Sequence, residues 1–203
     1  RAGNWAVSPV DARVDQFGEI RDTTVLQAKG IGYSIQHLIP SDTYRKFLWG
    51  SFMTLYLSPG DYHRIHSPVN GTVIGYCNVP GTLFTVQDWM VERLPGLFVK
   101  NERIITYLQS QAGTVGVCKI GAMNVGRITL SYSKIQTNRT FRRRREVFFS
   151  PEEQVPVSAG DELGVFHLGS TIILLFQKGA ITFDDFTPGD RIRMGKRIGT
   201  LHF

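Results

Sequence analysis

The chain alternates short runs of β-branched and aromatic residues with turn residues at close intervals. Residues 51–57 alternate strictly, with Met53, Leu55 and Leu57 on one side of an extended chain. Such residues favour strands because their side chains pack well on a pleated surface. The turn pairs between the runs are Pro59-Gly60, Asn70-Gly71, Pro80-Gly81, Pro95-Gly96, Ala159-Gly160 and Pro188-Gly189. The pattern therefore predicts a mainly β protein.

Further strands are expected at residues 71–76, 103–108, 114–120 and 125–131. Residues 171–176 carry apolar side chains on both faces, which predicts a central strand covered on both sides. Helices are few: one is expected to begin at Ser41-Asp42 and run through Phe47, and another to span residues 86–93. We predict one compact domain over residues 1–203, built of antiparallel sheets in a sandwich- or barrel-like arrangement with a few short helices.

Composition supports a folded domain with its own core. Of the 203 residues, 42% are hydrophobic and 20% charged, which excludes a disordered tail. The apolar run around residues 171–176 is far shorter than the roughly 20 residues of a membrane-spanning helix. Cys77 and Cys118 stand apart with no metal-type spacing, so we expect small buried side chains in a reducing compartment.

The charge is basic: 23 Lys and Arg against 17 Asp and Glu give +6. A basic surface favours phosphate-bearing partners, either anionic lipid or nucleic acid. The four arginines at 142–145 would point to both faces of a strand, so we interpret them as a solvated loop or turn. No zinc-finger or RNA-recognition signature accompanies them, and we expect no nucleic-acid partner.

Two segments concentrate chemically active groups. The first, residues 56–68, contains His63 and His66 three positions apart. The second, residues 160–171, places Gly169-Ser170 at the entrance to the apolar strand, where glycine allows a strained turn and leaves its carbonyl open to attack. Taken singly, structural histidines and a plain loop explain these segments as well. No third ligand at a telling spacing points to zinc.

Asp11 adds a third group, because Asp11, His66 and Ser170 follow the chain order of one serine-protease fold. In such triads the histidine takes the hydroxyl proton and the aspartate fixes the imidazole tautomer. A hydrolase elbow needs a second glycine, however, and Ile172 stands at that position. The nucleophile is therefore expected to act on its own backbone.

The chain closely resembles phosphatidylserine decarboxylases, and the matching segments follow one another in the same order from about Ser8 to Phe176. The segments that carry the resemblance are Gln27-Ala28-Lys29-Gly30 with Tyr33-Ser34, Leu57-Ser58-Pro59-Gly60-Asp61-Tyr62-His63-Arg64-Ile65-His66-Ser67-Pro68, Leu97-Phe98 with Asn101-Glu102-Arg103, Val115-Gly116 with Gly121-Ala122 and Val125-Gly126, and Gly164, Phe166 and Leu168-Gly169-Ser170-Thr171. A chance match on so many spaced segments is very improbable.

The resemblance implies a self-cleaving decarboxylase that depends on a pyruvoyl group and on no metal. In the family, the serine attacks the carbonyl of the preceding glycine, the chain splits, and the new terminal residue becomes the pyruvoyl group. Carried over, Ser170 is the nucleophile and cofactor precursor, and cleavage at Gly169 gives a β subunit 1–169 and an α subunit 170–203. His66 resembles the processing base, Asp11 its orienting carboxylate, and His63 the acid that protonates the substrate's α-carbon.

Three functional hypotheses follow. The first is decarboxylation of phosphatidylserine to phosphatidylethanolamine and CO2, which the basic surface mildly favours. The second keeps the mechanism but uses a free amino acid, including aromatic ones, as some relatives of this fold do. The third is a non-catalytic lipid-binding or structural paralogue, which would need a broken nucleophile or base, whereas Asp11, His66 and Ser170 are present.

The resemblance also implies a homodimer that works at a membrane surface as a peripheral protein. The lone cysteines place the active site on a reducing side. We expect a hydrophobic N-terminal extension, of the kind family enzymes use to approach the membrane, to precede Arg1. Three residues depart from the family pattern. Ala12 replaces a glycine after Asp11, Ala159 stands where lysine is common, and His167 is unusual.

Overall fold

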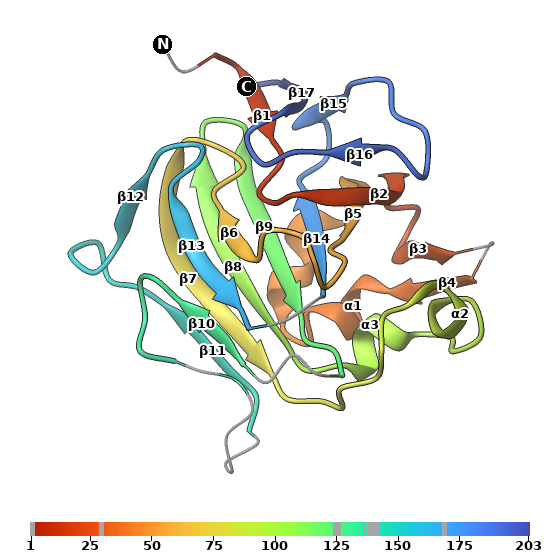
Figure 1. Ribbon diagram of the computed structural model, residues 1–203. Helices are drawn as coiled ribbons and strands as arrows, with labels where there is room; N and C mark the ends of the chain where they lie inside the picture. The colour runs from red at the N-terminus through yellow and green to blue at the C-terminus, as the bar shows by residue number, and fades with distance from the viewer. Residues whose placement is uncertain (1–2, 29–30, 124–126, 136, 138–142, 168–169) are drawn as a thin grey trace.

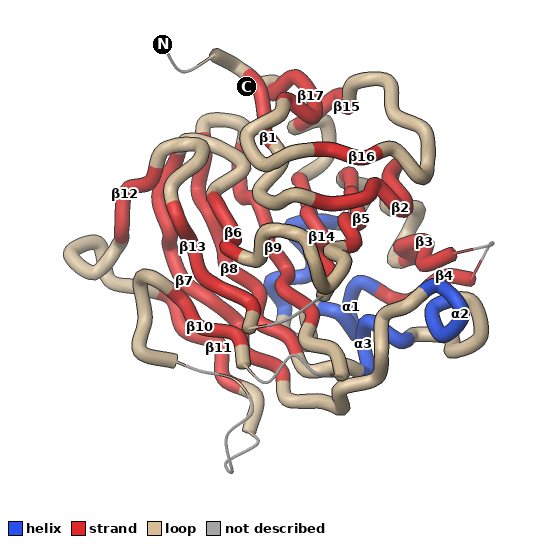
Figure 2. The backbone as a smooth tube through the Cα atoms, in the orientation of Figure 1, coloured by secondary structure: helices blue, strands red, loops and turns tan. Residues whose placement is uncertain are grey.

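The computed structural model describes residues 3–28, 31–123, 127–135, 137, 143–167 and 170–203. Strands dominate this part of the chain, and the few helices are short (Figures 1 and 2). The strand pairs within the sheets are antiparallel, as predicted. Among the described residues the strand order of each sheet has two ends, so the sheets are open and no barrel closes.

The largest sheet has nine strands and forms the body of the molecule. Its order is β11 (Arg145–Phe148), β7 (Gly71–Val79), β8 (Arg103–Ser110), β9 (Gly113–Ile120), β14 (Thr171–Phe176), β5 (Ser51–Tyr56), β2 (Ala12–Glu19) and β16 (Arg191–Ile192), and β12 (Val155–Val157) also pairs with β7. The strands expected at 51–57, 71–76, 103–108, 114–120 and 171–176 are therefore confirmed.

Smaller elements surround this sheet. Three strands, β10 (Ile128–Leu130), β13 (Glu162–Phe166) and β6 (Arg64–His66), lie over one of its faces (Figure 1). The other small sheet joins β1 (Trp5–Val7), β17 (Arg197–Leu201) and β15 (Ile181–Phe183), and β3 (Thr24–Ala28) pairs with β4 (Ile31–Ser34). The helices are α1 (Ile35–Leu38), the 3-10 helix η1 (Asp42–Phe47), α2 (Asp88–Val91) and α3 (Leu97–Lys100).

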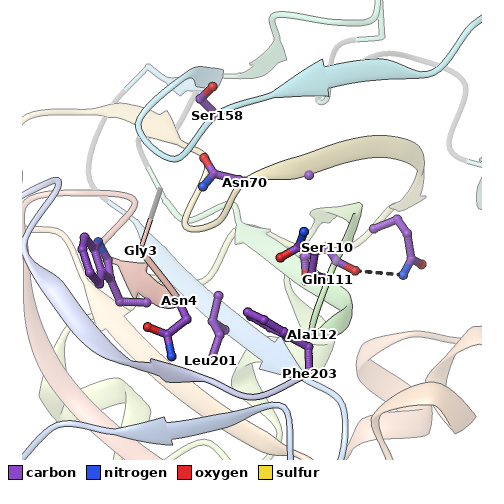
Figure 3. A pocket seen from close by; sticks show the side chains of 12 residues that line it. Gly3, Asn4, Asn70, Ser110, Gln111, Ala112, Ser158, Leu201 and Phe203 are labelled. Atoms are coloured by element: carbon purple, nitrogen blue, oxygen red, sulfur yellow. Dashed lines mark hydrogen bonds between the residues drawn. The ribbon is translucent and has the colours of Figure 1, made fainter. Parts of the chain in front are cut away.

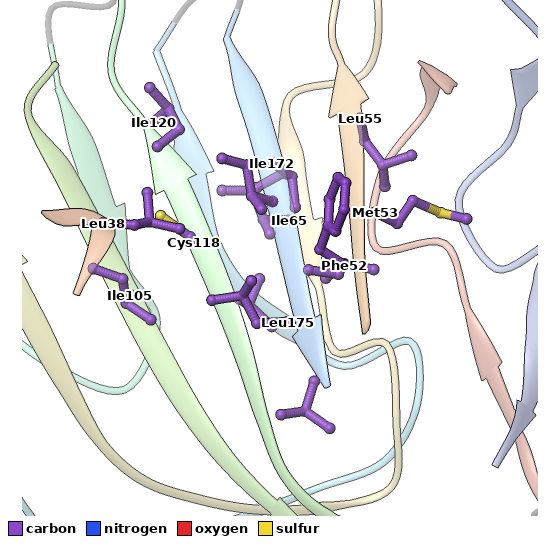
Figure 4. Close-up of a cluster of buried hydrophobic side chains, with 14 of the residues drawn as sticks. Leu38, Phe52, Met53, Leu55, Ile65, Ile105, Cys118, Ile120, Ile172 and Leu175 are labelled. Carbon is purple, nitrogen blue, oxygen red and sulfur yellow. The ribbon is translucent and has the colours of Figure 1, made fainter. Parts of the chain in front are cut away.

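Strand β14 is the centre of the core. All six of its residues are buried, and it pairs with β9 on one edge and β5 on the other. Apolar side chains from β5, β6, β9 and β14 pack together around Ile172 (Figure 4). The expectation of a central strand covered on both sides is confirmed, and its first residue follows directly on Ser170.

Some predicted elements differ from those observed. The helix expected from Ser41 is a 3-10 helix, and Ser41 does not cap it, because its hydroxyl donates to Glu146 (2.8 Å). The helix expected over 86–93 is limited to Asp88–Val91. The strand expected at 125–131 begins at Ile128, and residues 124–126 lie outside the described part of the chain.

The cysteines are buried as expected, and the arginine run matches its interpretation only in part, because Arg145 is the exposed first residue of strand β11. Arg143 and Arg144 are exposed and precede strand β11, while Arg142 lies outside the described residues. Cys77 and Cys118 are buried free thiols. Burial raises the pKa of Cys77 to about 11 and that of Cys118 to about 12, so both thiols are protonated at neutral pH.

Arg103 is buried and joins two helix ends. Its guanidinium donates to the carbonyls of His37 (2.5 Å), Leu38 (2.8 Å), Val99 (2.9 Å) and Asn101 (2.8 Å). The last carbonyls of a helix have no partner within the helix and carry partial negative charge. One cation therefore satisfies the carboxyl ends of both α1 and α3.

Lys119 is also buried, on the face of β9 that the sheet of β10, β13 and β6 covers. Its Nζ donates to the Thr106 hydroxyl and to Val117 O (3.3 Å), and Thr106 Oγ1 lies 2.5 Å from the hydroxyl of Tyr132. Because burial penalises the charged form, the pKa of Lys119 is lowered to about 7. The folded protein thus holds a largely neutral amine at alkaline pH.

This amine should make stability depend on pH. Between pH 7 and about 10.5 the unfolded chain binds a proton that the folded chain does not, so stability falls as pH falls through that range. We expect the free energy of unfolding to rise by about 3 kcal/mol from pH 7.5 to 9.5, relative to Lys119→Met. Urea denaturation at both pH values measures this difference. The exposed-lysine variant Lys178→Met should follow the wild type, and parallel curves for Lys119→Met would contradict the prediction.

Candidate active site

The topology brings the two histidines next to the strand that leads to Ser170. His66 ends β6, which pairs with β13, and the amide of Phe166 at the end of β13 donates to His63 O (3.0 Å). Ser170 lies four residues after Phe166, and β14 begins at the next residue, Thr171. Gly164 allows this crowding, because an added Cβ would lie 2.3 Å from the carbonyl oxygen of Thr129 on β10. Gly169, the predicted cleavage residue, lies outside the described residues.

His66 is buried and held from both ring nitrogens. Nδ1 lies 2.7 Å from Gly160 O, and Nε2 lies 3.1 Å from the hydroxyl of Tyr62. The two rings are stacked, with centroids 5.7 Å apart and an angle of 15°. A carbonyl can only accept, so Nδ1 carries the hydrogen, and in the neutral ring the lone pair of Nε2 accepts from Tyr62. Nε2 is thus the basic atom of His66.

His63 shows the same tautomer but has a free second nitrogen. Its Nδ1 donates to the carbonyl oxygen of Asp61. Its Nε2 is buried and has no hydrogen-bond partner among the described residues. A buried polar atom without a partner lowers the stability of the fold by about 1–3 kcal/mol, so native proteins usually keep such an atom for a functional reason. The geometry fits a group that exchanges a proton with a bound molecule.

Ser170 is fully buried at the start of β14. Its carbonyl oxygen accepts from the amide of Leu57 (2.8 Å), which fixes the backbone against β5. Neither its hydroxyl nor that of Thr171 has a hydrogen-bond partner within the described ranges. The structure therefore anchors the backbone of Ser170 while leaving its hydroxyl uncommitted.

Asp11 lies close to this region but does not bond to His66 in this structure. Its Oδ2 accepts from Arg193 (2.7 Å) and its Oδ1 from the amide of Met194 (2.8 Å). The Gly160 carbonyl, and not the Asp11 carboxylate, is the hydrogen-bond partner of His66 Nδ1. The segment of Asp11 is connected to His66 through the backbone instead, because the His66 amide donates to Pro9 O (2.9 Å).

The environment of Asp11 keeps its carboxylate ionised. Burial acts to raise the pKa of Asp11, but the Met194 amide and Arg193 outweigh it and hold the pKa below its usual range. Ala12, the departure from the family pattern, is a buried residue of β2 opposite Ile192. The substitution is thus accommodated in ordinary strand backbone.

The surroundings of the site include contacts that the sequence did not reveal. Sequence reasoning missed Tyr62 as a partner of His66 and Gly160 as its acceptor. It also missed the arginines that bind Asp11 and Asp61. The only local signal was the crowding of polar residues in 56–68, since Gly160 acts through its backbone and the arginines lie more than 100 residues away.

Two cavities differ in their relation to this chemistry. A small one of about 190 Å³ is lined by Asp11, Ala12, Asp61, Arg191, Ile192 and Arg193. A larger one of about 600 Å³ lies between the two ends of the described chain, beside Asn70 and Ser158 (Figure 3). Neither histidine nor Ser170 lines the larger cavity, so its size alone does not mark it as the active site.

Neither a metal cluster nor a membrane-spanning helix is found in the part of the chain that the structure describes. No group of three or more His, Cys, Asp or Glu side chains there is placed to hold a metal ion. The helices in these ranges are too short and insufficiently apolar to cross a bilayer.

Known proteins resemble the chain over nearly its whole length. Residues 1–200 match the sequence profile of a family described as phosphatidylserine decarboxylase. A protein of Myxococcus xanthus named phosphatidylserine decarboxylase proenzyme is 42% identical over 197 residues, covering 96% of this chain and 69% of that protein. Proteins of the same name from Saccharophagus degradans and Brevibacillus brevis are 40% and 36% identical. They cover 98% and 96% of this chain, and 70% of each relative.

Proposed function

The chain belongs to the phosphatidylserine decarboxylase family, and from this premise we propose that it converts phosphatidylserine to phosphatidylethanolamine and CO2 with a pyruvoyl group formed from Ser170. One observation carries the proposal: the Ser170 hydroxyl is buried without a hydrogen-bond partner among the described residues, and Ser170 lies just after β13, the strand that pairs with β6 and its His66. The name proenzyme, given to the relatives, also fits a chain that is processed.

In the proposed maturation, Ser170 Oγ attacks the carbonyl carbon of Gly169, and an ester replaces the peptide bond. The hydroxyl proton goes to His66 Nε2, the nitrogen without a hydrogen in the observed tautomer, after the Tyr62 hydroxyl that donates to it has turned away. Loss of the Ser170 α-proton then breaks the Cβ–Oγ bond and leaves a carboxylate on Gly169 and a dehydroalanine at 170. Water converts the dehydroalanine to the pyruvoyl group and releases ammonia.

The residues present fit such a group at position 170. Such a group would supply a carbonyl to hold the substrate amine and an electron sink for the pair that departing CO2 leaves. Because Ser170 is completely buried, the group would lie in the interior, apart from bulk solvent. His63 Nε2, with Nδ1–H fixed by the Asp61 carbonyl, is the atom we propose to take up a proton and then give it to the α-carbon, a step worth about 10²–10⁴-fold.

We also propose that two exposed apolar side chains near the start of β14, those of Phe84 and Met123, form a rim that meets the membrane. Phe84 and Met123 are 37% and 56% exposed, and the Met123 amide contacts Phe84 O (3.4 Å). The buried Asn101 side chain bonds to both backbone groups of Phe84 and to Gly121 O. Gly121 follows Ile120, which pairs with Thr171, so the rim lies beside the start of β14.

Two expectations about partners rest on other grounds. The net charge of +6 favours an anionic lipid surface as a partner. A homodimer is carried over from the family resemblance alone. Peripheral association with a membrane, as a proposal, follows from the lipid substrate.

The first test is an intact mass under denaturing conditions. We expect two chains divided between Gly169 and Ser170, the smaller one lighter by one ammonia than its serine-started sequence. Ser170→Ala removes the nucleophile and should stay full length, whereas Ser150→Ala, at an exposed serine, should cleave like the wild type. Cleavage of Ser170→Ala would point to an outside protease, and an uncleaved wild type would contradict the maturation.

The two histidines should separate the two steps. We expect His66→Ala to remain uncleaved, because the basic nitrogen is lost. His63→Ala should cleave but release CO2 at least 100-fold more slowly, because the proton donor is lost. Labelled CO2 from phosphatidylserine vesicles, and from free serine and aromatic amino acids, measures the second step. Release from a free amino acid but not from the lipid would overturn the lipid substrate and leave the pyruvoyl chemistry standing.

The rim can be tested by changing the physical state of the substrate. Phe84→Ser with Met123→Ser should reduce activity about tenfold on anionic vesicles but leave a soluble short-chain phosphatidylserine unaffected, since only the bilayer contact is removed. Phe148→Ser, an exposed phenylalanine on β11, is the matched control. Equal losses on both substrates would show that the pair supports the fold or the site instead.

A further inference from the structure

Two carboxylates beside the histidines are each held by an arginine from the last part of the chain. Arg191 Nη1 lies 3.1 Å from Asp61 Oδ2, and Arg193 Nη1 lies 2.7 Å from Asp11 Oδ2. The two arginines are two positions apart, at the start of β16 and directly after it. Both belong to residues 170–203, which the proposed cleavage separates from the histidines.

Asp61 connects its arginine directly to His63. Besides Arg191, Asp61 Oδ2 accepts from the amide of Ser58 (2.8 Å), and the Asp61 amide donates to Ser58 O (2.9 Å). The carbonyl of the same Asp61 accepts from His63 Nδ1. Asp61 is only 14% exposed while Arg191 is 59% exposed, so a surface arginine fixes a nearly buried turn. The orientation of the His63 ring depends on that turn.

Asp11 connects its arginine to His66 by a separate route. Arg193 and the amide of Met194 hold the two carboxylate oxygens, which fixes the segment that contains Pro9. The carbonyl of Pro9 accepts from the His66 amide (2.9 Å). The two routes share no side chain, although all four charged residues line the same cavity of about 190 Å³.

We infer that Arg191 and Arg193 are positioning residues that act on different steps. Arg191 acts through Asp61 on His63 and so on decarboxylation, and Arg193 acts through Asp11 on self-cleavage. This inference rests on the proposed function. Ion pairs with exposed arginines contribute only about 0–1 kcal/mol to stability, whereas misplacing a reacting group by 1 Å can cost about 100-fold in rate. Their effect should therefore appear in rates rather than in stability.

The test compares Arg191→Met, Arg193→Met and a matched control on the same segment. Arg197→Met is the control, because Arg197 forms an ion pair of similar length with Asp184 (3.1 Å) outside the cavity. We expect Arg193→Met to slow cleavage about tenfold, with kcat of the matured enzyme within twofold of wild type. Arg191→Met should cleave at the wild-type rate, with kcat about tenfold lower and KM unchanged. Arg191→Lys should recover part of that loss.

Cleavage is followed by denaturing gel and intact mass, decarboxylation by CO2 release from short-chain phosphatidylserine, and folding by thermal unfolding. If both variants slow both steps alike and lose thermal stability, the arginines only support the fold and the inference is wrong. It is equally wrong if neither variant differs from Arg197→Met. A wild type that neither cleaves nor releases CO2 would overturn the proposed function, and the inference with it.

Discussion

The burial of β14 is the constraint on which the rest of the architecture depends. A strand with six buried residues must be covered on both faces and paired on both edges, since an unpaired backbone group inside the core is costly. Strands β9 and β5 supply the pairing, and the sheet of β10, β13 and β6 covers one face. Ser170, directly before this strand, is consequently buried, and its carbonyl is bonded to the amide of Leu57.

The polar groups around that point fall into two kinds. Some are fully satisfied, like the Arg103 guanidinium, whose four carbonyl partners stabilise its charge in the interior. Others, like His63 Nε2 and the hydroxyls of Ser170 and Thr171, are buried without partners among the described residues. The contrast separates groups that stabilise the fold from groups that the fold holds ready for chemistry, because an unsatisfied atom persists only where other interactions compensate.

Much of the fold could be predicted from the sequence because burial leaves a local periodic pattern. Residues 51–57 and 171–176 identified β5 and β14 by their side-chain alternation and continuous apolarity. The missing cap at Ser41 could not be predicted, because the Ser41 hydroxyl bonds to Glu146, a residue 105 positions away. Likewise the Asp61–Arg191 pair spans 130 positions and leaves no periodic trace. The residue types of the site were visible in the sequence, but their partners depend on the tertiary fold.

The position of β14 within its sheet has a consequence for whether the matured protein could refold after unfolding. After the proposed cleavage, residues 170–203 would form a separate chain that contributes the middle strand of the large sheet and also pairs β16 with β2 and β17 with β1. Folding of the precursor is unimolecular, whereas refolding of the matured protein would require two chains to find each other, and so would depend on concentration. The uncleaved chain is thus the form in which this sheet is assembled, and the lifetime of the matured protein would be set by its rate of unfolding.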